Sequence, residues 1–177
     1  MVVLETERLR LRQLTSSDAP FIVALLNDPD WLRYIGDRGV RTEEQAVAYI
    51  ENGPQRSYAA HGFGLYLVER KAGGEAIGLC GLIQRDFLTD IDLGFAFLPN
   101  FRGAGYAFEA AAGVLRDAGA RLTLTRVVAI TALDNEPSAR LLQKLGFHFE
   151  GLIAYPGEDE PVRLFGCTLD TIDAAAL

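Results

Sequence analysis

Residues 102–105, "RGAG", place one arginine and two glycines between an apolar run and an alanine-rich segment. If a helix begins here, its free backbone N–H groups lie at the positive end of the helix dipole, where an anion such as a pyrophosphate can bind. Gly103 and Gly105 would let phosphate oxygens touch the backbone, and Arg102 would add a positive charge. An ordinary tight turn is the alternative. Two nucleotide-binding fingerprints do not fit, because no Gly-Lys-Ser/Thr follows and Phe108 stands where the dinucleotide motif needs a third glycine.

Cysteine and histidine, which also suit nucleophilic or metal chemistry, are scarce. Cys80 and Cys167 stand in apolar segments with no histidine nearby in sequence, which favours reduced core thiols over a catalytic cysteine. His61 precedes a predicted strand and could reach a bound acceptor, whereas His148 alternates with two phenylalanines and should face outward. Neither histidine has a metal-ligand partner at useful spacing, so we expect no metal.

The segments around the glycine loop indicate the elements that hold it. Residues 90–98, "DIDLGFAFL", predict a strand that leads into the loop. Apolar positions between about 105 and 118 recur at the three-four spacing of a helix lying on a sheet. Further along the chain, the patterns predict a strand at 125–133, a helix at 136–146 ended by Gly146, and a final strand pair at 147–155 and 162–169.

The first half of the chain predicts one strand, two helices and a hairpin. Residues 8–14 alternate leucine with polar side chains, as a half-buried strand does. "TSSDAP" (15–20) is a helix-start signal, and "NDPD" (27–30) should stop that helix. A capping-box pair, Thr42 and Gln45, opens a second helix that should end at the "NGP" of 52–54. Strands at 64–70 and 76–83 then form the hairpin.

This order of elements describes one mixed α/β domain over residues 1–177, a central, mostly antiparallel sheet flanked by helices. The chain is 49% hydrophobic, which suits a globular protein. Its formal net charge of −7, with acids and bases mixed, argues against a nucleic-acid partner but allows a local basic pocket. With no secretory signal and no run of transmembrane length, we expect a cytoplasmic protein with no membrane partner.

Four ordered segments resemble the GNAT N-acetyltransferase superfamily. "RGAGYA" (102–107) matches Arg/Gln-x-x-Gly-x-Gly/Ala, the acetyl-CoA pyrophosphate motif of that superfamily, and 90–110 is similar to its strand-loop-helix core. Residues 132–151, "ALDNEPSARLLQKLGFHFEG", resemble the next block. The start "ETERLRLRQLTSSDA" (5–19) is similar to the branch that contains the ribosomal-protein N-terminal acetyltransferases. The resemblance covers nearly the whole chain and implies the GNAT fold and an acetyl-CoA-dependent N-acetyltransferase.

The resemblance also implies where the cosubstrate, acetyl-CoA, would bind. The strand before the loop is expected to splay from the next one, which leaves peptide groups free for the pantetheine arm. Arg102 would stand at the loop entrance, and Asn135 would lie beside the pantetheine or the adenylate end. The backbone groups implied are those of Phe95, Ala96 and Phe97 for pantetheine, and of Gly103, Ala104, Gly105, Tyr106, Ala107 and Phe108 for the pyrophosphate.

Transfer of the acetyl group by direct attack needs a neutral amine and a leaving thiolate. The resemblance makes Asp92 the preferred base, although it could also be a solvated charge at a strand end. Asp86 and Glu109 are weaker candidates, and Glu109 should meet solvent on the polar side of its helix. Many relatives carry a tyrosine as general acid seven residues after the asparagine, where this chain has Leu142. Ser138 is a substitute that could equally cap its helix, and a thiol with a pKa near ~8.5 can leave without an acid.

The acceptor is open between a protein N-terminus and a small amine, and the acidic chain mildly favours cationic acceptors. Trp31, with Arg33 and Tyr34, could form an acceptor wall, or Trp31 could simply cap the core. The acceptor pocket should come from 31–41, 61–63, 84–91 and 153–160. Because Leu142 replaces the tyrosine, a non-catalytic acyl-CoA-binding or sensing domain is an alternative function. A monomer and a homodimer are both compatible with the sequence.

Overall fold

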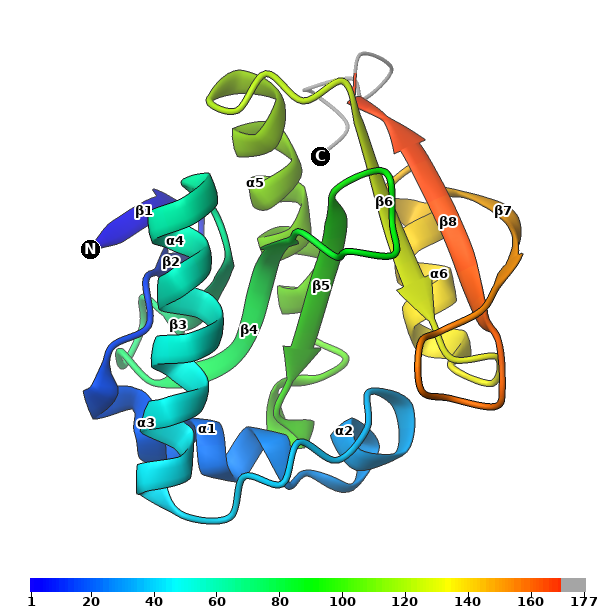
Figure 1. Ribbon diagram of the computed structural model, residues 1–177. Coiled ribbons are helices and arrows are strands. Elements are labelled where there is room, and N and C mark those ends of the chain that lie inside the picture. Colours follow the sequence, from blue (N-terminus) through cyan, green and yellow to red (C-terminus); the bar gives the residue numbers. More distant parts are fainter. Residues whose placement is uncertain (170–177) are drawn as a thin grey trace.

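In the computed structural model, which describes residues 1–169, eight strands form one sheet in the order β1-β2-β3-β4-β5-β6-β8-β7 (Figure 1). All neighbouring strands are antiparallel except β5 and β6, which are parallel. The prediction of a mixed α/β fold with a mostly antiparallel sheet is confirmed. The strands are β1 Val2–Glu5, β2 Leu9–Arg12, β3 Leu65–Arg70, β4 Ala76–Ile83, β5 Asp92–Phe97, β6 Arg126–Thr131, β7 His148–Ile153 and β8 Val162–Thr168.

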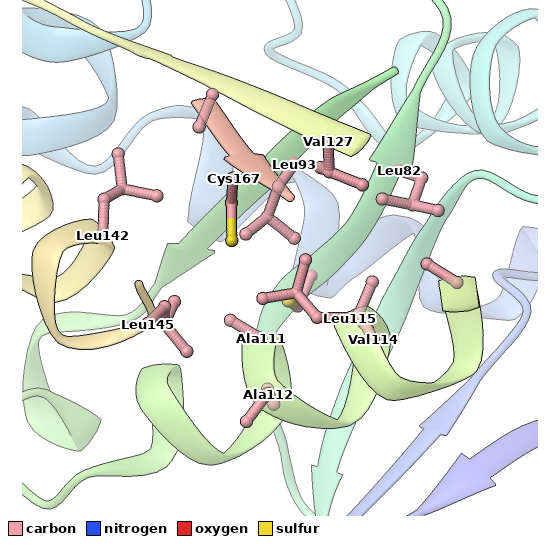
Figure 2. Packing of buried hydrophobic residues seen from close by; sticks show 14 of the residues in the cluster. Leu82, Leu93, Ala111, Ala112, Val114, Leu115, Val127, Leu142, Leu145 and Cys167 are labelled. Carbon is pink, nitrogen blue, oxygen red and sulfur yellow. The ribbon is translucent and has the colours of Figure 1, made fainter. Parts of the chain in front are cut away.

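Helices cover both faces of the sheet. On one face α5 packs against β1, β2, β4 and β5, and its alanine-rich side lets the helix lie close to the strands (Figure 2). The same core continues to α6 through Leu142 and Leu145. On the other face α1 and α3 pack on Leu67 and Leu79. The helices are α1 Ala19–Leu26, α2 Pro29–Tyr34, α3 Glu43–Ile50, α4 Arg56–His61, α5 Tyr106–Ala120 and α6 Glu136–Lys144.

The second predicted helix does not end at "NGP". It continues through a π-helical turn, Glu51–Gln55, into α4, and it ends at Gly62 with a positive φ of 75°. A proline inside an α-helix removes a hydrogen bond and clashes with the carbonyl four residues earlier. The wider π-turn accommodates Pro54, which is buried. One long rod therefore runs from α3 to α4 along one side of the sheet (Figure 1).

Two further elements were not predicted. β1 pairs with β2 to make an N-terminal hairpin. α2 covers Pro29–Tyr34, at the start of the connection between the two predicted helices, where no helix was predicted. α2 begins at Pro29, and the side chain of Asp28 caps it by accepting a hydrogen bond from Asp30 N at 3.2 Å. Asp28 is also the residue through which α2 is tied to the glycine loop, as described below.

Both cysteines lie in the core, where the sequence predicted them. Cys80 and Cys167 are buried and free, as predicted. Within residues 1–169, no helix has the length and apolar character needed to cross a membrane.

Candidate active site

β5 and β6 diverge soon after they meet. Their register contains a single pair, Asp92 with Val128, while β6 pairs with β8 along its whole length. On its other edge β5 stays paired with β4, and Leu98 N donates to Ile77 O at 2.9 Å. Because the backbone groups of successive strand residues turn to alternate edges, the N–H and C=O groups of Phe95 and Phe97 face the gap.

The peptide groups of Ala96, by the same alternation, turn to β4. The groups left free for a pantetheine arm are therefore both peptide groups of Phe95 and the N–H of Phe97, since the carbonyl of Phe97 accepts from Arg102, while Ala96 lines the wall. The predicted divergence of the two strands is present.

The divergence opens into a cleft of about 1310 Å³. One wall contains β5, the glycine loop and the first turn of α5, and another contains the end of β6 and the first turns of α6. α2 and the face of the α3–α4 rod close the remaining sides. The volume exceeds that of a typical small-molecule site, about 300–1,000 Å³, and suits two substrates bound together.

The glycine loop has the geometry of an anion site. Gly103 and Gly105 have φ values of 77° and 82°, a left-handed conformation that other residues adopt only with strain. Gly105 caps α5, whose first backbone bond runs from Glu109 N to Gly105 O at 3.0 Å. The helix therefore leaves the N–H groups of its first turn, Tyr106 to Phe108, without helical acceptors beside the cleft.

Arg102 braces the loop against α2. Its Nη2 lies 2.8 Å from Asp28 Oδ1, its Nη1 contacts Asp30, and its Nε donates to Phe97 O at 3.0 Å. Two carboxylates therefore neutralise the guanidinium, so the positive charge that Arg102 was expected to add to the loop is already paired within the protein. A direct role for Arg102 in phosphate binding stays a prediction.

Arg8, which no sequence signal pointed to, supports the loop from outside. Its Nη1 donates to Ala104 O at 2.9 Å, and its guanidinium lies 4.5 Å from the centroid of the Tyr106 ring. Its Nε pairs with Glu109 Oε2 at 2.6 Å, and Thr6 Oγ1 donates to Glu109 Oε1 at 2.6 Å.

Glu109 was predicted to meet solvent, and that prediction is wrong. Its carboxylate instead binds Thr6 and Arg8 and so holds the β1–β2 turn against α5. Burial alone would raise the pKa of Glu109, yet the hydrogen bonds from Thr6 and Arg8 lower it. The prediction failed because both partners lie about a hundred residues earlier in the chain.

Asp92 is a buried carboxylate in the wall of the cleft, with 1% of its surface exposed. Arg85 Nε donates to its Oδ2 at 2.6 Å, and Arg85 Nη1 donates to the hydroxyl of Tyr155 at 3.3 Å. The other oxygen, Oδ1, has no hydrogen-bond partner among the described residues. The alternative interpretation of Asp92, a solvated charge at a strand end, is therefore excluded.

The pKa of Asp92 is raised to about 6. Burial is the dominant cause, and the charge and hydrogen bond of Arg85, with the Ile130 amide, oppose it. The carboxylate is thus mostly ionised at pH 7 while being a stronger base than an exposed aspartate. The other two weighed carboxylates differ, since Asp86 is exposed and Glu109 binds Thr6 and Arg8.

Asn135 and Ser138 lie together at the start of α6 and line the cleft. Asn135 Oδ1 accepts a hydrogen bond from Ser138 N at 3.3 Å and caps the helix. Arg163 of β8 holds this corner, because its Nη2 donates to the carbonyls of Ala132 and Asn135, and its Nε donates to Thr131. Sequence reasoning missed Arg163, whose partners come from a strand neighbour about thirty residues earlier.

Leu142 does not line the cleft. It is fully buried in the core that α5 and α6 share (Figure 2). The residue of that helical turn in the cleft wall is Leu141. The side chain at this spacing therefore carries no information about the chemistry inside the cleft.

The acceptor side is only partly where it was predicted. Segments 31–41, 61–63 and 84–91 each contribute to the cleft, whereas none of 153–160 is in its wall. The rod from α3 to α4 also supplies residues that were not predicted for the acceptor pocket. The unpredicted residues are Tyr49, Asn52, Gly53, Pro54, Arg56, Ser57 and Ala60.

Trp31 both packs in the core and lines the cleft, with 6% of its surface exposed. Tyr34 also lines the cleft, while Arg33 pairs with Asp134 at 2.7 Å and ties α2 to the β6–α6 loop. His61 lies in the wall at the end of α4, and His148 is exposed as predicted. Within residues 1–169, no three His, Cys, Asp or Glu residues gather as metal ligands.

A splayed parallel strand pair with a left-handed glycine loop at a helix start gives a cleft that suits an extended ligand with an anionic group. The chain belongs to the GNAT acetyltransferase family, because the model of the acetyltransferase (GNAT) domain matches residues 8–148. It is 34% identical over 154 residues to the uncharacterized N-acetyltransferase YoaA of Bacillus subtilis, and the match covers 85% of each chain.

Solved structures show the same fold. A GNAT-family acetyltransferase from Bacillus anthracis superposes with a TM-score of 0.79 at 23% identity, covering 94% of this chain and 98% of that one. A ribosomal L7/L12 α-N-protein acetyltransferase in complex with coenzyme A has a TM-score of 0.77 at 18% identity, covering 98% and 99%. The family and fold inferred from the motifs are confirmed.

Proposed function

We propose that this protein transfers an acetyl group from acetyl-CoA to a primary amine, by direct attack of the amine and without a covalent enzyme intermediate. The observation that carries the proposal is the pairing, in one cleft, of the free edge of β5 with the buried base Asp92. The edge and the glycine loop suit the donor, and the carboxylate suits the proton that the amine must lose.

The donor site consists of backbone groups. Both peptide groups of Phe95 and the N–H of Phe97 are free to pair with the amides of pantetheine, whereas the carbonyl of Phe97 already accepts from Arg102. The N–H groups from Gly103 to Phe108 would hold the pyrophosphate. A structural neighbour that contains coenzyme A supports this choice of donor. Asn135 stands across the gap from β5, at the start of α6.

Asp92 would take the proton from the amine. An aliphatic amine is mostly protonated at pH 7, so attack needs a base that is ionised yet not too weak. A carboxylate with a pKa of about 6 and one unbonded oxygen meets both conditions. Arg85 keeps that carboxylate charged and oriented through its hydrogen bond to Oδ2.

Ser138 is the proposed partner of the leaving thiolate. Its backbone N–H is bonded to Asn135, and its half-buried side chain lines the cleft. A hydroxyl there can donate a hydrogen bond to the departing sulfur. Because a thiolate is a stable leaving group near neutral pH, we expect Ser138 to contribute less than Asp92.

The acyl-CoA sensor, the alternative function, loses its support. It rested on the absence of a tyrosine at position 142, and Leu142 belongs to the core rather than to the cleft. A buried base with an unbonded oxygen is an unstable arrangement that a binding module would not need. The two buried free thiols suit the cytoplasm as the compartment.

Turnover of acetyl-CoA with a panel of primary amines tests the proposal, with release of free thiol as the signal. The panel should contain amino acids, amino-acid amides, polyamines and peptides with free N-termini. We expect acetylation of at least one class, and loss of about 10²–10⁴-fold in Asp92→Asn. Tight binding of acetyl-CoA with no thiol release above background across the panel would overturn the proposal.

A further inference from the structure

The walls of the cleft carry the opposite charge to the whole chain. Six cationic side chains line it against three carboxylates, although the protein has a net charge of −7. At physiological ionic strength an exposed charge is screened beyond about 8 Å, so a bound substrate responds to the wall and not to the distant surface. The cations are Arg38, Arg56, Arg85, Arg102, Arg140 and Lys144, and the carboxylates are Asp28, Asp30 and Asp92.

All three carboxylates are already paired. Asp28 and Asp30 hold Arg102, and Asp92 holds Arg85. The other four cations have no ion pair with any residue in the described part of the chain. The cleft therefore presents positive charge that the protein itself does not neutralise.

These four cations form two separate pairs. Arg140 and Lys144 are four residues apart on α6, the helix that begins at Asn135, and they suit the phosphates of the donor. Arg38 and Arg56 come from the α2–α3 connection and from α4, and both line the cleft.

Arg38 lines the same cleft as the proposed base. Tyr49 of α3 lines the cleft, and burial raises the pKa of its hydroxyl while the charges of Arg38 and of Arg85 lower it. Both guanidinium groups must therefore lie within electrostatic reach of one hydroxyl. Arg85 is bonded to Asp92, whereas Arg38 has no ion pair with any residue in the described part of the chain.

We infer that the acceptor is a small primary amine that also carries a carboxylate, which Arg38 and Arg56 bind while its amine faces Asp92. The inference rests on the proposed function and names its substrate class. Guanidinium groups bind carboxylates through paired, charge-assisted hydrogen bonds, and no wall carboxylate is free to hold a polycation.

Matched acceptor pairs test the charge of the substrate. An amino acid and its amide differ only in the carboxylate, so kcat/KM is compared within pairs such as phenylalanine and phenylalaninamide, with spermidine and an N-terminal peptide as the other arms. We expect the carboxylate member to be preferred by about tenfold or more, the range of a hydrogen bond to a charged group. Equal or better turnover of amides, polyamines or peptides overturns the inference while the proposed function stands.

Substitutions of Arg38 and Arg56 test whether these two residues bind the carboxylate of the acceptor. Arg38→Gln and Arg56→Gln should each reduce kcat/KM for the carboxylate substrate by about tenfold and leave that for its amide within twofold. Arg10→Gln is the control, because Arg10 is an exposed arginine of β2 whose side chain pairs with Glu5 outside the cleft. Losses of equal size on both substrates would assign the two arginines a structural role and contradict the inference.

A binding measurement separates the two proposals. Trp31 is the single tryptophan and lines the cleft, so its fluorescence reports acceptor binding without turnover. With coenzyme A bound, the carboxylate amine should change the emission at concentrations that Arg38→Gln shifts upward by about tenfold. Binding without turnover would fail the proposed function alone, whereas turnover with no preference for the carboxylate would fail the inference alone.

Discussion

Asp92 combines two properties that a structural aspartate rarely has together. It is 1% exposed and bonded to Arg85, yet it keeps one oxygen without a partner among the described residues. As the proposed base it works only when ionised. We therefore expect kcat/KM for the amine to fall as the pH drops through about 6, with a slope of one proton.

Asp92→Asn tests this assignment. The variant should lose the acidic limb near pH 6 together with about 10²–10⁴-fold in kcat, while the affinity for coenzyme A stays unchanged. The pH profile of kcat/KM and a separate measurement of coenzyme A binding check both parts. An unchanged limb in the variant would show that another group titrates.

Arg85 is a positioning residue that acts through Asp92. Its positive charge and hydrogen bond lower the pKa of the carboxyl, against the larger effect of burial. Arg85→Gln should therefore move the acidic limb above pH 6, so that activity lost at pH 7 returns at pH 8 to 9. Tyr155→Phe, which removes only the 3.3 Å hydrogen bond to Arg85, should move the limb in the same direction by less. A uniform loss at every pH would indicate a purely structural role.

At this scale the sequence predicts residue types better than their partners. Asp92, Ser138, Gly103 and Gly105 were predicted from short segments that resemble the family, and all four line the cleft. The braces Arg8, Arg102 and Arg163 could not be placed, because their partners lie roughly thirty to a hundred residues away. Arg102, predicted to stand at the loop entrance, also links α2 to the loop, and its role in phosphate binding stays a prediction.

Among the elements, the start of α5 depends on the backbone of one glycine. Gly105 has a φ of 82°, so an alanine at this position is strained by about 1–2 kcal/mol. Gly105→Ala should lower the free energy of unfolding by that amount and weaken the binding of coenzyme A. Chemical denaturation and a titration with coenzyme A measure the two effects.

Gly53→Ala is the matched control. Gly53 lies in the helical rod, does not have a positive φ, and a Cβ there would meet no atom within 4 Å. Alanine restricts the unfolded chain, so this variant should be neutral or more stable by up to about 1 kcal/mol. If both variants had the same effect on stability, the argument from the left-handed conformation would be wrong.

Elements were predictable where local signals and tertiary packing agree. β4 was predicted at its observed bounds, because a short apolar run between turn residues predicts a buried strand. The rod from α3 to α4 was cut short because "NGP" is a strong stop signal, and only the packing of the buried Pro54 and the π-turn override it. α2 is too short to show helical periodicity, so its Asp28-Pro29 start was read only as the end of α1.

On the scale of the whole molecule, the sheet consists of two parts with a weak join. β1 to β5 form one part, and β6, β8 and β7 form the other, joined in the sheet by one register pair between β5 and β6. The ion pairs of α2 also reach both parts, through Asp28 to the glycine loop and through Arg33 to Asp134 (Figure 1). A donor bound in the gap would supply partners for backbone groups on the open edge of β5.

Coenzyme A should therefore stabilise the fold by bridging the two parts. At a concentration of one hundred times Kd, linkage gives about 2.7 kcal/mol, which corresponds to a rise in Tm of very roughly 5–10 °C for a chain of this size. Hydrogen exchange should slow most at the amides of Phe95 and Phe97 and at the start of α5. Adenosine monophosphate, which lacks the pantetheine arm, is the control and should protect neither strand amide. If coenzyme A raised Tm without protecting β5, its arm would lie elsewhere, and the two parts of the sheet would not be bridged by the donor.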